Sequence, residues 1–220
     1  MYTSQLFHIL FTASSQIICY NRIDIGGYSH PSGEVFMEVR DRIDEEIYKI
    51  GAPLIDTDFF EQAKLQCHHK RTSLYDHTMG VARIAVKICD RCDANHFPID
   101  RRSVILAALC HDLGMIGRDE KYTNGFVSCQ MHPYESALLA AEYFPDIDDE
   151  TLRAIRRHMW PATPLPPLTV EEWALIQADK MASLEDVTGF NTFRESFPAA
   201  MMEHPLTGRI YTAAKGSARQ

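Results

Sequence analysis

The chain has 220 residues, of which 45% are hydrophobic and 24% are charged, and its formal net charge is -8. This composition is typical of one folded domain with a packed core, and it excludes a largely disordered chain. The negative charge disfavours duplex nucleic acid as the main partner, because such binding depends on Lys and Arg contacts with phosphates.

The cysteines and one apolar stretch bear on the compartment. The stretch LFHILFTASSQIICY, residues 6–20, is shorter than the ~20 apolar residues of a membrane-spanning helix and has no basic leader. We therefore expect a cytoplasmic protein with reduced thiols and no membrane partner. Cys89 and Cys92 form a CxxC, but no second CxxC accompanies it, and its helical setting favours a structural role over a redox or zinc site.

Three segments are expected along the chain. Residues 1–35 show no helical period and include the turn-rich GGYSHPSG, which indicates a poorly ordered leader or a misassigned start upstream of Met37. The main domain is expected over residues 36–205. Residues 206–220 are expected to form a flexible tail.

Helices are predicted one after another within the main domain. The first is expected to end at Gly51 and Pro53, and a second is expected over residues 56–66. A third begins after the N-cap Ser73 and places His77 on its core face. The apolar positions that predict the first helix are Val35, Val39, Ile43 and Ile47.

The middle of the chain contains further histidines at helix ends. The helix that starts near residue 100 is expected to stop at Gly114, with His111 pointing inward. A loop is expected over residues 115–131. The next helix is expected to begin near His132, with Pro133 in its first turn.

The last predicted helices add two more polar residues on inward faces. The segment DDETLRAIRRHMW is amphipathic, is ended by Pro161 and holds His158 in its last turn. Thr169 caps the following helix, which turns Asp179 inward. A final helix is expected over residues 192–202. Because no segment of alternating polarity is long enough for a sheet, the chain is predicted to be all-α.

Six ionisable residues therefore fall on inward faces. Burying them together is tolerable mainly if they hydrogen-bond to each other or bind metal. Imidazole and carboxylate ligands suit Fe, Mn or Zn, and a carboxylate can bridge two ions through its two oxygens. Asp112 is the natural bridge, because it follows one ligand directly at a helix end. The six residues are His77, His111, Asp112, His132, His158 and Asp179.

The order of these residues resembles the HD superfamily, a helical metal-dependent fold whose members are mostly phosphohydrolases. Over about residues 61–187, the chain is similar to a group of small bacterial HD proteins in the segments TSLYDHTMGVA, LAALCHDLG, HPYESAL, RRHMWP and QADKMASLED. The resemblance implies an HD-domain-like helical bundle. It also implies one divalent ion held by His77, His111, Asp112 and Asp179, and a second held by Asp112, His132 and His158.

The implied activity is hydrolysis (EC 3.1 class) of a phosphate ester or anhydride by a metal-activated hydroxide. We expect a small phosphorylated metabolite, and first a nucleotide, as substrate. The chain lacks the glycine-tyrosine-proline signature of the cyclic-di-GMP phosphodiesterases, and it also lacks the lysine that they carry after HDLG. These two departures disfavour cyclic-di-GMP as the substrate.

Three more residues are candidates for contact with the substrate. Lys180 follows a predicted ligand and could bind a phosphate or protonate a leaving oxygen, and its alternative is a solvated surface lysine. His69 is a candidate catalytic and substrate-binding residue, and Arg71 a candidate substrate-binding residue, with surface roles as the alternative. Substrate choice is expected to lie with residues 117–129 and with the segment WPATPLPP.

Two other functions stay open at this level. The same order of six ligands occurs in HD-fold diiron oxygenases. A non-catalytic nucleotide-binding signalling module could also keep the metal for stability alone, although a purely structural site tends to close every coordination position. The pattern of residues carries no prediction of the oligomeric state.

Overall fold

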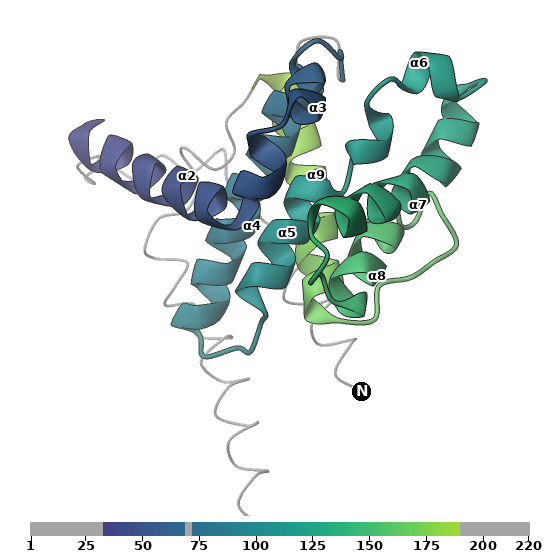
Figure 1. Ribbon diagram of the computed structural model, residues 1–220. Coiled ribbons are helices and arrows are strands. Elements are labelled where there is room, and N and C mark those ends of the chain that lie inside the picture. The colour runs from purple at the N-terminus through teal and green to yellow at the C-terminus, as the bar shows by residue number, and fades with distance from the viewer. Residues whose placement is uncertain (1–32, 69–71, 190–220) are drawn as a thin grey trace, which may run out of the picture. The chain divides into compact units, whose positions relative to one another are not determined.

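The computed structural model describes residues 33–68 and 72–189, and these residues form a helical domain (Figure 1). The described part of the chain contains no strand beyond one isolated bridge between Cys67 and Ser73, so the all-α prediction is confirmed. The elements are α2 (Gly33–Ile55), α3 (Asp58–Glu61), η1 (Gln62–Lys64), α4 (Leu74–Ala94), α5 (Arg101–Cys110), η2 (Leu113–Met115), α6 (Arg118–Lys121), α7 (Gly125–Tyr143), α8 (Asp149–Arg157) and α9 (Val170–Thr188).

Helix α5 lies at the centre of this domain. Its residues from Ser103 to Cys110 are all buried, and it packs against α4, α8 and α9 (Figure 1). Full burial of each large aliphatic side chain stabilises the fold by ~1.5–3 kcal/mol. The buried C-terminal end of α5 therefore carries the next two residues, His111 and Asp112, into the interior.

The predicted helix starts are confirmed where a side chain caps the helix. The Ser73 hydroxyl accepts a hydrogen bond from the Asp76 amide at the start of α4, and the Thr169 hydroxyl accepts one from the Glu172 amide at the start of α9. Such a cap is worth about 1 kcal/mol, and it depends only on neighbouring residues. These boundaries are thus local properties of the chain.

Helix α2 corrects the predicted end at Gly51 and Pro53, because it continues to Ile55. Gly51 lies against Leu109 of α5, so its lack of a side chain allows close helix packing rather than ending the helix. Pro53 is accommodated within the last turns. The helix expected over residues 56–66 is also shorter than predicted, since that stretch divides into α3 and η1.

Helix α7 begins well before the predicted start at His132. The Asn124 side chain caps it by accepting a hydrogen bond from the Val127 amide, so much of the expected loop 115–131 is helical. Pro133 consequently lies inside the helix rather than in its first turn. Burial of the helix face on either side of Pro133 compensates for the hydrogen bond that a proline cannot donate.

The CxxC cysteines are free thiols on α4. Burial raises the pKa of Cys89 to about 12 and that of Cys92 to about 11, which disfavours the reactive thiolate. In the described residues, no helix has the length and apolar character that a membrane crossing requires. The predicted helix over residues 192–202 and nearly all of the predicted leader and tail lie outside the described residues.

Candidate metal centre

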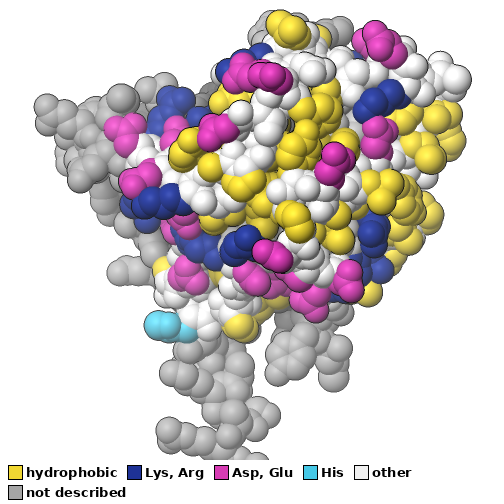
Figure 2. All heavy atoms as spheres, in the orientation of Figure 1, with side chains coloured by type: hydrophobic (Ala, Val, Ile, Leu, Met, Phe, Trp, Pro, Cys, Tyr) yellow, Lys and Arg dark blue, Asp and Glu magenta, His cyan; other side chains and the backbone are white. Residues whose placement is uncertain are grey.

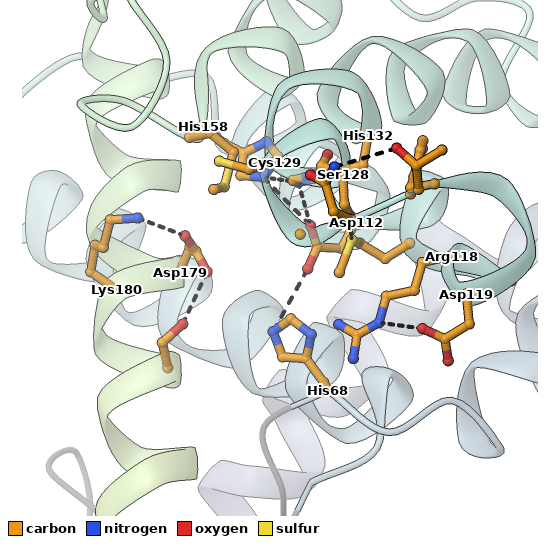
Figure 3. A pocket seen from close by; sticks show the side chains of 17 residues that line it. His68, Asp112, Arg118, Asp119, Ser128, Cys129, His132, His158, Asp179 and Lys180 are labelled. Atoms are coloured by element: carbon orange, nitrogen blue, oxygen red, sulfur yellow. Dashed lines mark hydrogen bonds and ion pairs between the residues drawn. The ribbon is translucent and has the colours of Figure 1, made fainter.

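The structure brings the six predicted ligands together, and we call them the His–Asp cluster. They come from five places in the fold: α4, the end of α5, α7, the end of α8, and α9. All six side chains are buried. Figure 3 shows Asp112, His132, His158 and Asp179 converging on one pocket. The cluster consists of His77, His111, Asp112, His132, His158 and Asp179.

Two groups of possible ligands lie within the cluster, and a third joins the neighbouring His68 to His77 and Asp112. In the first group, the ligating atoms of His77, His111 and Asp179 all lie within 4.8 Å of one another. In the second group, the Nε2 atoms of His132 and His158 lie 3.2 Å and 3.4 Å from Asp112 Oδ1. Each group therefore offers nitrogen and oxygen atoms at distances that one ion can bring into coordination.

Asp112 stands between the two groups. Its Oδ1 faces His132 and His158, whereas its Oδ2 lies 3.5 Å from His111 Nε2. The two oxygens thus point to different sets of imidazoles. This is the arrangement that a carboxylate bridge between two ions requires.

Three of the histidines are oriented by backbone carbonyls. The Nδ1 atoms of His111, His132 and His158 lie 2.8 Å, 2.7 Å and 2.7 Å from carbonyl oxygens of their own helices. A ring that donates its Nδ1 proton to a carbonyl presents the lone pair of its Nε2. The local helix geometry therefore turns three nitrogens that could bind metal into the cluster.

His77 is oriented by a carboxylate that the sequence interpretation missed. Its Nδ1 lies 2.6 Å from Asp186 Oδ2, and its Nε2 lies 3.4 Å from Asp179 Oδ1. A carboxylate behind a metal-binding imidazole fixes its tautomer and raises its basicity. Asp186 follows Asp179 by two helical turns on α9, and this spacing is the signal that could have identified it.

Two observations test whether these residues fit a metal. The Nε2 atom of His111 is buried without a hydrogen-bond partner, which is costly for a polar atom. The Nε2 atoms of His132 and His158 lie 3.1 Å apart, so the lone pairs of two neutral rings would face each other unless a cation or proton lies between them. A divalent ion in each group would relieve both conflicts, and the nitrogen and oxygen donors suit Fe, Mn or Zn.

The protonation equilibria of the cluster favour ionised carboxylates. Burial disfavours these charges, but the surrounding imidazoles outweigh it and hold the pKa of Asp112 and of Asp179 below the usual range. Burial lowers the pKa of His111 to about 4 and so keeps its ring neutral. Burial also opposes the charge on His77, but the neighbouring carboxylates of Asp179 and Asp186 raise its pKa to about 10.

Gly114 sets the distance between Asp112 and His132. Contrary to the prediction, it does not end α5, which stops at Cys110, and it lies within η2. A Cβ atom on Gly114 would stand 2.6 Å from the carbonyl oxygen of His132. The Gly114 amide also donates to Ser136 of α7 at 2.9 Å. The glycine is therefore needed for close approach of η2 to α7.

The cluster opens into a pocket of about 800 Å³ (Figure 3). Residues 118, 119, 122–125, 128 and 129 line it, as expected for the predicted specificity segment 117–129. The other predicted segment, WPATPLPP (residues 160–167), contributes none of the lining residues; the pocket wall on that side consists of His158 and Met159. The Ala162 carbonyl oxygen of this segment instead accepts a hydrogen bond from Gln130 of α7 at 3.1 Å, so the expectation that the segment lines the pocket is wrong.

Of the predicted substrate contacts, Lys180 lines the pocket, and its Nζ lies 3.3 Å from Asp179 Oδ2. His69 and Arg71 lie outside the described residues. Their neighbour His68, which was not predicted, lines the pocket with its Nε2 3.9 Å from Asp112 Oδ2 (Figure 3). Its ring also lies 4.2 Å from the ring of His77, centroid to centroid. His68 and His69 are adjacent in an irregular segment, where no helical periodicity indicates which side chain faces the pocket.

Comparison with known proteins gives one finding. The family model of the HD domain matches residues 74–184, a range that contains all six residues of the His–Asp cluster. No curated protein matches the chain. No solved structure matches it either.

Proposed function

The chain belongs to the HD-domain family, whose members are mostly metal-dependent phosphohydrolases, and we propose that it hydrolyses a phosphate ester or anhydride of a small phosphorylated metabolite. A nucleotide is the first candidate for the substrate. One observation carries the proposal. The two oxygens of Asp112 face two different imidazole groups at the floor of a pocket of about 800 Å³, which suits a small ligand.

We infer that His77, His111, Asp112 and Asp179 hold one divalent ion, and that Asp112, His132 and His158 hold another. Such a pair of ions supplies positive charge for the phosphoryl oxygens and lowers the pKa of water. The buried imidazoles exclude bulk solvent from the floor of the pocket. Asp112 and Asp179, which also line the pocket, would remain anionic and retain the ions near neutral pH.

We propose that Lys180 either protonates the leaving oxygen or binds a phosphoryl oxygen. Its ammonium lies beside Asp179 at 3.3 Å, and its side chain remains 48% exposed, so it can reach a bound substrate. An ammonium has three donors and binds phosphate as a compact charge. His68, across the pocket next to Asp112 Oδ2, is placed to contact the same substrate.

The proposal is tested by metal analysis and substrate screening of one preparation. The wild-type chain is loaded with Mn²⁺ or Fe²⁺, its metal content is measured, and nucleotides and phosphodiesters are screened as substrates. Asp112→Asn keeps the shape of the side chain but removes its charge. We expect a loss of metal and a decrease in activity of at least ~100-fold, because even the residues behind metal ligands contribute ~10–100-fold.

Asp146→Asn is the matched control, because Asp146 is an exposed carboxylate after α7 that does not line the pocket. It should retain its metal and lose less than about threefold of the activity, as expected for a surface carboxylate. Activity that survives in Asp112→Asn would contradict the proposal. So would a fully loaded wild type that hydrolyses no phosphate. A mixed-valence diiron signal in anaerobically purified protein would favour the oxygenase alternative instead.

A further inference from the structure

Arg118 is a cation of the pocket wall that the proposed chemistry does not use. It begins α6, lines the pocket and keeps a side chain that is 30% exposed. Figure 3 shows it on the opposite side of Asp112 from Lys180. The two cations therefore approach the pocket from different walls.

The guanidinium of Arg118 has only a weak partner. Its Nε lies 3.6 Å from Asp119 Oδ1, on a carboxylate that is 83% exposed, and no described residue accepts a hydrogen bond from it. Exposed pairs of this kind contribute little to stability. Lys180, in contrast, is already placed beside the buried carboxylate of Asp179. Arg118 thus has donors available for an anion in the pocket.

The backbone that carries Arg118 is anchored to the neighbouring elements. The Tyr122 hydroxyl donates to Glu135 Oε2 on α7 at 2.6 Å and lies 3.1 Å from the carbonyl oxygen of Gly114 in η2. Lys121 forms an ion pair with the same Glu135. Since α6 is tied to α7, which carries His132, and to η2, which directly follows Asp112, less conformational entropy is lost when Arg118 binds a ligand.

Resting on the proposed function, we propose that Arg118 binds a second anionic group of the substrate, a phosphate or carboxylate separate from the phosphoryl group that is cleaved. A guanidinium is charged at all relevant pH values, and its planar fork of N–H donors matches either anion. In the proposed mechanism, the cluster and Lys180 bind the phosphoryl group that is cleaved, at the floor of the pocket. The pocket has room for more than one phosphoryl group. The preferred substrates are therefore bisphosphates or phosphorylated carboxylates.

Phosphonates test this inference by binding alone. In a phosphonate, a carbon–phosphorus bond replaces the phosphorus–oxygen ester bond that the protein is proposed to cleave, so the ligand is not hydrolysed. Isothermal titration of the Mn²⁺-loaded protein compares phosphonoacetate, 3-phosphonopropionate and 4-phosphonobutyrate with alkylphosphonates of equal length. At least one carboxylated member should bind ~10-fold or more tightly than its alkyl counterpart, the usual gain from a charge-assisted hydrogen bond. Arg118→Gln should abolish this preference, and Arg118→Lys should retain part of it.

Arg102→Gln is the matched control, since Arg102 is exposed in the first turn of α5 and does not line the pocket. It should keep the full preference, and all variants should keep the wild-type Mn²⁺ content. The inference is overturned if no carboxylated member binds more tightly, or if the preference survives in Arg118→Gln. Failure of the proposed function would look different: the wild type would show the preference but hydrolyse no phosphate.

Discussion

At the scale of single residues, the His–Asp cluster depends on groups that lie behind the atoms proposed to bind metal. The sequence could predict its six members, because each falls on the inward face or at the end of a predicted helix and their order resembles that of the HD superfamily. Asp186 was missed although it lies two turns after Asp179 on the same helix. That spacing places it on the same face of α9 as Asp179, but its role follows from a contact with His77 on α4, which the spacing alone does not predict.

Asp186→Asn tests the role of this carboxylate. The amide can still contact His77 Nδ1, but it no longer supplies the negative charge that raises the basicity of the imidazole. We expect Mn²⁺ affinity to fall ~10–100-fold. Isothermal titration measures the affinity, and circular dichroism in chelator checks that the metal-free variant is folded.

Asp146→Asn is the comparison for this variant, because Asp146 is an exposed carboxylate in the turn after α7. It should bind Mn²⁺ as the wild type does. If Asp186→Asn also keeps wild-type affinity while remaining folded, His77 does not need its carboxylate partner, and the positioning role assigned to Asp186 is wrong.

At the scale of elements, prediction succeeded where the signal is local and failed where packing decides. Ser73 and Thr169 cap the helices that follow them, and the short reach of a cap makes it visible in the sequence. Gly51 and Gly114 were expected to end helices. Both instead allow another element to approach closely, which depends on residues far along the chain.

Gly114→Ala tests the close approach of η2 and α7. The new methyl group would meet the His132 backbone, which cannot rotate away as a side chain could, so either η2 or α7 must move. We expect a loss of ~1–3 kcal/mol in the free energy of unfolding, as in other overpacked sites. Because the shift separates Asp112 from His132, the metal content should fall as well.

Gly125→Ala is the paired substitution, since a methyl group at Gly125 meets no atom within 4 Å and lies in the first turn of α7. It should be neutral or stabilising by up to ~1 kcal/mol. Urea unfolding of both variants gives the comparison. If Gly114→Ala kept the wild-type unfolding midpoint and metal content, the close approach of η2 to α7 would not require a glycine at this position.

At the scale of the whole molecule, an acidic chain is expected to act on an anionic substrate. The net charge of -8 does not oppose this, because Lys and Arg side chains are interspersed with Asp and Glu on the face that Figure 2 draws, and binding is decided by the local charges of the pocket. Arg118 and Lys180 line its walls, and the cluster at its floor is suited to cations. The pairing of Asp112 with both imidazole groups is the central feature, because it determines whether two ions can share one carboxylate.

Anomalous X-ray diffraction at the manganese edge, from crystals of the Mn²⁺-loaded protein, tests this feature most directly. We predict two peaks, one on each side of the Asp112 carboxylate. One peak should be bound by His77, His111 and Asp179, and the other by His132 and His158. A single peak, or peaks outside the His–Asp cluster, would contradict the shared carboxylate and the two-ion site.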